Sequence, residues 1–199
     1  MKNRFSIVGS IAVVLLAASA RAQSIDSARG AFAARVAAYA AMHRELERRV
    51  FPGVPAADHN AEPGAVRRLR EAIRAARPRP REGNVFAPVA DTLRRDLRLA
   101  LREQGLEPRA LIAEMLDDTE EGARPPVLNE PFSWALGSAM LPSLMAALPE
   151  LPDELEYRLV GPHLVLIDID ANLVVDILRD ALLDTATVSK APVPKRVPK

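Results

Sequence analysis

Two aspartates near the C-terminal end of the chain have the spacing best suited to chemistry. Asp168 and Asp170 end a β-branched, apolar run, and alternate residues of a strand project from the same face. Their carboxylates would lie about 7 Å apart along such a strand. With Asn172 as a further oxygen donor, Asp168 and Asp170 form a candidate site for a hard divalent cation such as Ca²⁺ or Mg²⁺.

This pattern resembles the start of an EF-hand loop, but two positions depart from it. Leu173 stands where that loop needs glycine, and Arg179 stands where a bidentate glutamate would close it. We therefore favour the alternative of a solvent-facing acidic strand with an Asx turn at Asp170.

Histidine is the other residue type that could do chemistry here. His163 follows a Gly-Pro turn and completes a candidate catalytic set with Asp168 and Asp170, although an ordinary turn residue is the favoured interpretation. His43 lies on an apolar helical stripe, which predicts a neutral imidazole at the edge of the core rather than a ligand or base. His59 lies in a loop, where a metal site would need distant ligands.

Familiar catalytic signatures are missing from the sequence. It contains no G-x-S-x-G, H-E-x-x-H, G-x-x-x-x-G-K or G-x-G-x-x-G motif, and no organic cofactor is predicted. The chain has no cysteine, which excludes thiolate catalysis, cysteine-ligated zinc and disulfide bonds. Whether the protein is an enzyme is left open by the sequence.

The N-terminal segment 1–22 has the three parts of a secretory signal peptide. Lys2 and Arg4 give a positive start, Ile7–Ala18 is mostly apolar, and Ala20 and Ala22 are small residues at the −3 and −1 positions of a cleavage site. The apolar run is shorter than the roughly 20 residues of a membrane-spanning helix. Cleavage after Ala22 and a periplasmic or secreted product are predicted; an uncleaved anchor is the alternative.

Length and composition limit the class of protein. The 199 residues, of which 49% are hydrophobic, suit one domain with an apolar core. The net charge is only +1, and the basic residues are neither interleaved with aromatic residues nor part of a nucleic-acid motif. A nucleic-acid partner is therefore not predicted. After the leader, no segment approaches spanning length, so no membrane span is expected in the mature chain.

Helical spacing dominates residues 23–121. Apolar residues recur every three or four positions, as on one face of a helix. The first predicted helix runs from Ser24 to Val50, with an inward stripe of Phe32, Val36, Tyr39, His43, Leu46 and Val50. Three more are predicted at about Pro63–Ala76, Pro88–Gln104 and Pro108–Thr119, each separated from the next by proline or glycine.

The second half of the chain changes character. Six prolines interrupt residues 122–153, which predicts short helical turns packed over the helices, with Trp134 in the core. Residues 154–186 predict a three-stranded antiparallel meander followed by a helix at Leu178–Asp184; a helix over Asn172–Leu183 is the rival interpretation of the third strand. Residues 187–199 predict a disordered, basic, proline-rich tail.

The predicted fold is thus α+β, a mainly helical N-terminal bundle with a small C-terminal three-stranded antiparallel meander. The C-terminal stretch LPELPDELEYRLVGPHLVLIDIDANLVVDIL resembles the ending of an uncharacterised family of exported bacterial proteins. The residues that carry the resemblance form a YRxxG…DxxANLxxD pattern: Tyr157, Arg158, Gly161, Asp168, Ala171, Asn172, Leu173 and Asp176. The resemblance implies export and a similar layout, but no activity.

Two hypotheses for function follow from these observations. The favoured one is an exported soluble protein without enzymatic activity, which binds a protein partner in the cell envelope. The alternative is an acid-assisted, divalent-metal-dependent enzyme that uses the region of Asp168 and Asp170. The oligomeric state is left open.

Overall fold

The structure is a computed structural model that describes residues 7–52 and 64–183. The start of the predicted leader, the loop with His59 and the predicted tail at residues 187–199 lie outside the described residues. Five helices are described: α1 Ile7–Val50, α3 Ala65–Ala76, α4 Ala90–Glu103, α5 Pro108–Asp117 and α6 Pro142–Ala146. Four strands accompany them: β1 Ser138–Ala139, β2 Leu155–Val160, β3 His163–Asp168 and β4 Leu173–Leu178. The predicted α+β class is confirmed.

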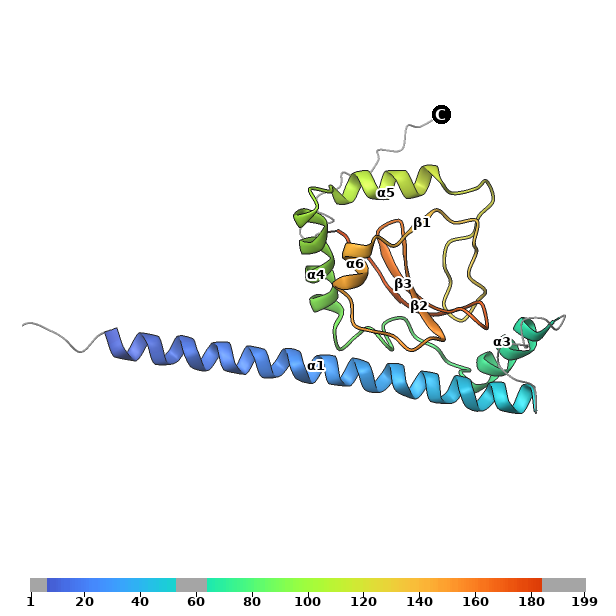
Figure 1. Cartoon of the computed structure of the whole chain (residues 1–199), viewed down its shortest axis with the longest axis horizontal. Coiled ribbons are helices and arrows are strands. Elements are labelled where there is room, and N and C mark those ends of the chain that lie inside the picture. Colours follow the sequence, from blue (N-terminus) through green and yellow to red (C-terminus); the bar gives the residue numbers. More distant parts are fainter. Residues whose placement is uncertain (1–6, 53–63, 184–199) are drawn as a thin grey trace, which may run out of the picture.

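The longest element, α1, begins well before the predicted start at Ser24. Residues 7–23 are rich in alanine, leucine and valine and contain no proline, so the helix propagates through them without a break. In Figure 1 the N-terminal part of α1 extends beyond the rest of the molecule, while its C-terminal part lies along it next to α3. Among the α1 side chains that the structure describes, which begin at Gln23, the first to pack against the main core is that of Ala28.

The three C-terminal strands form the predicted antiparallel meander. Leu155 of β2 pairs with Asp168 of β3, and Leu164 of β3 pairs with Leu178 of β4. Residues 173–178 are therefore strand rather than helix. A short fourth strand, β1, comes from the proline-broken segment and pairs with the end of β2, giving the order β1-β2-β3-β4.

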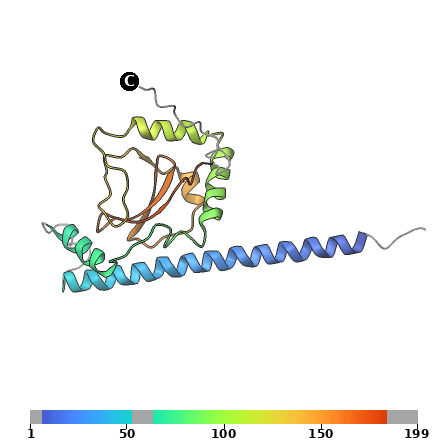
Figure 2. The same cartoon turned by 180° about the vertical axis from the view of Figure 1, so that it is seen from behind.

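Both faces of this sheet are buried, which explains the nearly continuous apolar runs of β3 and β4. One face joins the helices in a single large core, in which Phe86 stacks between Phe32 and Tyr157 with ring centroids 6.3 Å apart on each side. The helices are thus packed on the sheet, as the two opposite views in Figures 1 and 2 show. The other face carries a smaller cluster: Phe132, Val160, Val165, Ile167, Val174 and Ile177.

Three sequence-based expectations of burial or secondary structure are wrong. Asp168, expected on a solvent-facing strand, is fully buried. Trp134 is 55% exposed, because Phe132 fills the core position and Trp134 packs edge-on against it while Arg158 lies over the indole ring. The helix expected at Leu178–Asp184 is not formed over its described residues, which are the end of β4, a turn and a bend. Contacts made by arginines of α4 with backbone carbonyls of this segment outweigh its helical spacing.

No helix within residues 7–52 and 64–183 is both long and apolar enough to cross a membrane.

Candidate functional site

The end of strand β3 brings Asp168 into contact with helix α1. Asp168 is fully buried, and its Oδ2 atom accepts a hydrogen bond of 2.8 Å from the hydroxyl of Tyr39 and lies 2.6 Å from Nδ1 of His43. Its Oδ1 atom accepts the backbone N–H of Ala171 at 2.8 Å. Both carboxylate oxygens are therefore engaged within the protein, and they attach α1 to the β3–β4 turn.

His43 follows Tyr39 by one turn of α1 and is also fully buried. An ionised carboxylate only accepts hydrogen bonds, so Nδ1 of His43 is the donor to Asp168. The other ring nitrogen, Nε2, lies 3.7 Å from Oδ2 of Asp170. Among the described residues, Nε2 has no hydrogen-bond partner. Nδ1 of the imidazole is thus held by Asp168, whereas Nε2 makes no hydrogen bond to the described residues.

The electrostatics of this cluster are strongly negative. Burial lowers the pKa of His43, but the hydrogen bond to Asp168 and the charges of Asp168, Asp170 and Glu47 outweigh burial and raise it. The Asp170 side chain is 37% exposed, and burial together with the neighbouring Asp168 charge raises its pKa. The negative charges of Asp168, Asp170 and Glu47 thus act on the imidazole of His43, and they favour a positive charge at this position.

The arrangement of Asp168, Asp170 and Asn172 differs from the metal site predicted from the sequence. Asp168 and Asp170 do approach a common group, His43, but β3 ends at Asp168 and Asp170 lies in the turn that follows, so the predicted strand alternation does not account for this placement. Asn172 adopts a left-handed backbone conformation with φ of 46°, and its backbone oxygen accepts a hydrogen bond from Arg70. Over the described part of the chain, no three His, Asp or Glu side chains are already grouped as a metal site.

His163 lies apart from the two aspartates. It begins β3 while Asp168 ends it, which separates them by roughly 17 Å along the strand. Nδ1 of His163 accepts the backbone N–H of Asp180 at 3.1 Å. Burial and the charge of Arg179 lower its pKa, so the neutral form is favoured. The expected grouping of His163 with Asp168 and Asp170 is therefore not found. His43 is the histidine that lies beside the two aspartates.

A third buried polar residue is Asp176, which belongs to the YRxxG…DxxANLxxD pattern but to which the sequence assigned no role. Its carboxylate accepts backbone N–H groups from Gly83, Val85 and Phe86 at 2.6–2.8 Å, and so holds the 83–86 turn against β4. Burial raises its pKa in spite of these hydrogen bonds. No sequence signal links Asp176 to a turn about 90 residues away, and its role is structural.

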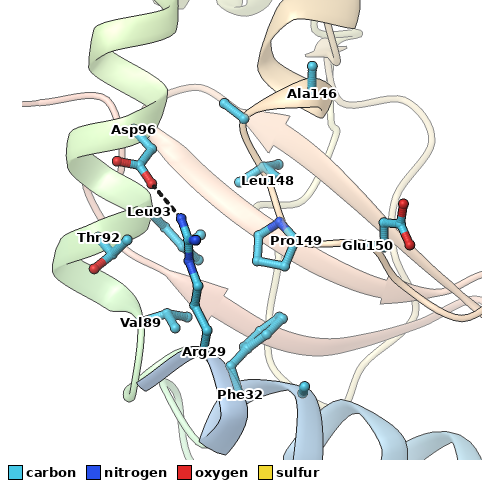
Figure 3. Close-up of a pocket in the computed structure, with 12 residues that line it drawn as sticks. Arg29, Phe32, Val89, Thr92, Leu93, Asp96, Ala146, Leu148, Pro149 and Glu150 are labelled. Carbon is cyan, nitrogen blue, oxygen red and sulfur yellow. Dashed lines mark ion pairs between the residues drawn. The ribbon is translucent and has the colours of Figure 1, made fainter. Parts of the chain in front are cut away.

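A cleft of about 400 Å³ lies between α1, α4 and the segment after α6. Figure 3 shows Phe32, Leu93 and Leu148 at its floor, with Arg29 reaching across toward Asp96. The three floor residues are buried, and Nη2 of Arg29 is 3.9 Å from Oδ2 of Asp96. Twelve residues line the cleft: Arg29, Phe32, Ala33, Val89, Thr92, Leu93, Asp96, Ala146, Ala147, Leu148, Pro149 and Glu150.

The chemistry of this cleft suits binding rather than catalysis. Its floor is apolar, and its rim carries a cation, Arg29, and two carboxylates, Asp96 and Glu150. Small-molecule and side-chain pockets have this combination of an apolar interior with a few charged groups at the edge. No imidazole lines the cleft, and the cluster around His43 is separate from it.

Comparisons with known proteins give no family assignment: no family model, no curated protein and no solved structure matches the chain. The resemblance to an exported bacterial family stays a prediction.

Proposed function

We propose that this protein is exported and acts without enzymatic activity, binding a partner protein of the cell envelope through the cleft between α1, α4 and the segment after α6. The cleft is the observation that carries the proposal. Asp168, Asp176 and His163 of the described chain all have structural hydrogen-bond partners, whereas the cleft combines a buried apolar floor with a charged rim.

Export follows from the leader at residues 1–22. A mature chain that begins at Gln23 keeps every described contact of α1 with the core, of which the first is made by Ala28. N-terminal sequencing of the protein from a periplasmic fraction or the medium should give Gln23 as the first residue; an intact Met1 would exclude a cleaved leader.

The occupant that fits the cleft is an amphipathic segment of the partner protein. An apolar side chain of that segment would contact the apolar floor formed by Phe32, Leu93 and Leu148. Charged residues flanking it would pair with Arg29 and Glu150 at the rim. Burial of an apolar anchor surrounded by polar contacts is how protein interfaces gain most of their affinity.

Two adjacent alanines of α1 give a matched test. Ala33 lines the cleft, whereas Ala34 is exposed and does not. A photo-crosslinking amino acid at position 33 should capture one defined envelope protein, and the same group at position 34 should not. Binding of that purified partner should then fall at least about tenfold in Ala33→Trp, which fills the cleft, and stay unchanged in Ala34→Trp.

An identical crosslinking result at both positions would contradict the proposal, as would unchanged binding by Ala33→Trp. The alternative of an acid-assisted, metal-dependent enzyme would have to use His43 with Asp170 in place of His163, and it first requires a metal site there.

A further inference from the structure

The buried imidazole of His43 has one ring nitrogen that its surroundings leave available. The side chain is fully buried, and Nε2 has no hydrogen-bond partner among the described residues. A buried, unpaired ring nitrogen costs free energy unless something binds it. Oδ2 of Asp170 lies 3.7 Å away, and the Asp170 side chain is 37% exposed, so it connects this buried nitrogen to the surface.

Asp168 holds the ring as a metal-bound histidine is usually held. In metal sites the non-ligating ring nitrogen donates to a carboxylate or carbonyl, which fixes the tautomer and makes the ligating nitrogen more basic. Here Nδ1 of His43 lies 2.6 Å from Asp168, and Tyr39 and the backbone N–H of Ala171 fix that carboxylate in turn. The contacts that orient a metal-bound histidine are therefore present around His43.

The distance between the two available atoms suits a metal ion. Zinc binds imidazole nitrogen at about 2.0–2.1 Å and carboxylate oxygen at about 2.0–2.2 Å, so tetrahedral ligands of these types lie about 3.4 Å apart. Nε2 of His43 and Oδ2 of Asp170 are 3.7 Å apart. An ion between them needs only a small side-chain adjustment. Imidazole with carboxylate favours a transition metal such as Zn²⁺ over Ca²⁺ or Mg²⁺.

Glu47 is a further acid close to this pair. It follows His43 by one turn on α1, so the two share one side of the helix. Its charge raises the pKa of both His43 and Asp170, so it adds to the negative potential that attracts a cation.

We propose that Nε2 of His43 and the carboxylate of Asp170 bind a divalent transition-metal ion, with water completing the coordination. The ion fastens α1 to the β3–β4 turn. Asp168, the central residue of the predicted site, is then a positioning residue for His43 rather than a ligand.

The test is titration of the untagged protein with ZnCl₂ at about pH 8, well above the ordinary pKa of histidine. Calorimetry should show one ion per chain, and the melting temperature should rise with zinc concentration. Asp170→Asn should weaken binding at least about tenfold, a loss typical of altered metal-site residues. Asp153→Asn, which changes an exposed acid outside the site, should leave zinc affinity unchanged.

Nitrogen-15 spectra of the histidine side chains identify the ligating atom independently of stability. Zinc should shift the Nε2 resonance of His43, while Nδ1 keeps its proton. The proposal is overturned if neither heat nor a melting shift accompanies zinc, if Asp170→Asn binds zinc as the wild type does, or if the His43 Nε2 resonance does not move. Because none of these measurements depends on the cleft, their failure leaves the proposed binding function untouched.

Discussion

The hydroxyl of Tyr39 donates a hydrogen bond of 2.8 Å to Oδ2 of Asp168, although 129 positions separate the two residues in the chain. Burial and the charge of Asp168 raise the pKa of Tyr39 well above its ordinary value, so the hydroxyl keeps the proton it donates. This bond and the adjacent one from His43 join the longest helix to the sheet.

Replacement of Asp168 by asparagine should be strongly destabilising. Every group facing the carboxylate is a donor: the Tyr39 hydroxyl, Nδ1 of His43 and the N–H of Ala171. The amide NH₂ of asparagine would have to face one of them. We expect a loss of about 3–5 kcal/mol in the free energy of unfolding, as when a buried pair is broken. Urea denaturation followed by circular dichroism measures it; a loss no larger than that in Asp153→Asn would contradict the network.

Two buried tyrosines provide an internal comparison. The hydroxyl of Tyr39 has an acceptor, whereas that of Tyr157 has none among the described residues. Tyr39→Phe should cost about 2 kcal/mol, the value of a hydrogen bond to a charged group. Tyr157→Phe should be neutral or stabilising, because it removes an unpaired buried polar atom. Equal effects of the two substitutions in chemical denaturation would refute this assignment.

The fold was largely predictable because it follows from periodicity. Apolar spacing of three and four marks the helices, and alternating or continuous apolar runs mark the strands of the meander. Strand alternation also separates His163 from Asp168, because the two residues are an odd number of positions apart in β3 and project from opposite faces.

The contacts of the candidate site could not be predicted in this way. The pairing of His43 with Asp168 depends on how α1 packs on the sheet, and no local spacing encodes a contact between such distant segments. Trp134 was misplaced for the same reason, since Phe132 and Trp134 are both aromatic and only packing decides which is buried. The Leu178–Asp184 segment has helical spacing but is held by arginines of α4.

Gly137 should tolerate no side chain, while Gly30 should accept one. A Cβ atom at Gly137 would lie 1.8 Å from the backbone oxygen of Met115, which cannot move away as a flexible side chain could. Gly137→Ala should therefore cost about 3 kcal/mol by overpacking. Gly30 lies within α1 with nothing near its added Cβ, so Gly30→Ala should stabilise the protein by up to about 1 kcal/mol.

Thermal and urea unfolding of both alanine variants checks this pair. A Gly137→Ala protein as stable as the wild type would mean that the 135–137 segment does not pack against the end of α5. That packing also includes the hydrogen bonds from Gly137 to Thr119 and from Thr119 to Met115.

His163 should make the protein less stable in acid. Burial, followed by the charge of Arg179, lowers its folded-state pKa below 6.5, and its Nδ1 must be unprotonated to accept the N–H of Asp180. Between the folded and unfolded pKa values, the unfolded chain binds the proton more readily. The contribution of His163 to the free energy of unfolding is therefore fully present above pH 6.5. It is lost as the pH falls through the folded-state pKa of His163.

Asparagine is the matched replacement, because its Oδ1 atom can accept the same N–H and does not titrate. The stability difference between wild type and His163→Asn should be constant from about pH 8 down to about pH 7 and then shift against the wild type toward about pH 5. Urea denaturation at a series of pH values measures the two curves, and subtracting them removes the titration of other groups, such as His43. Parallel curves across the whole range would show that His163 does not titrate differently on folding, and that its contact with Asp180 has no effect on its protonation.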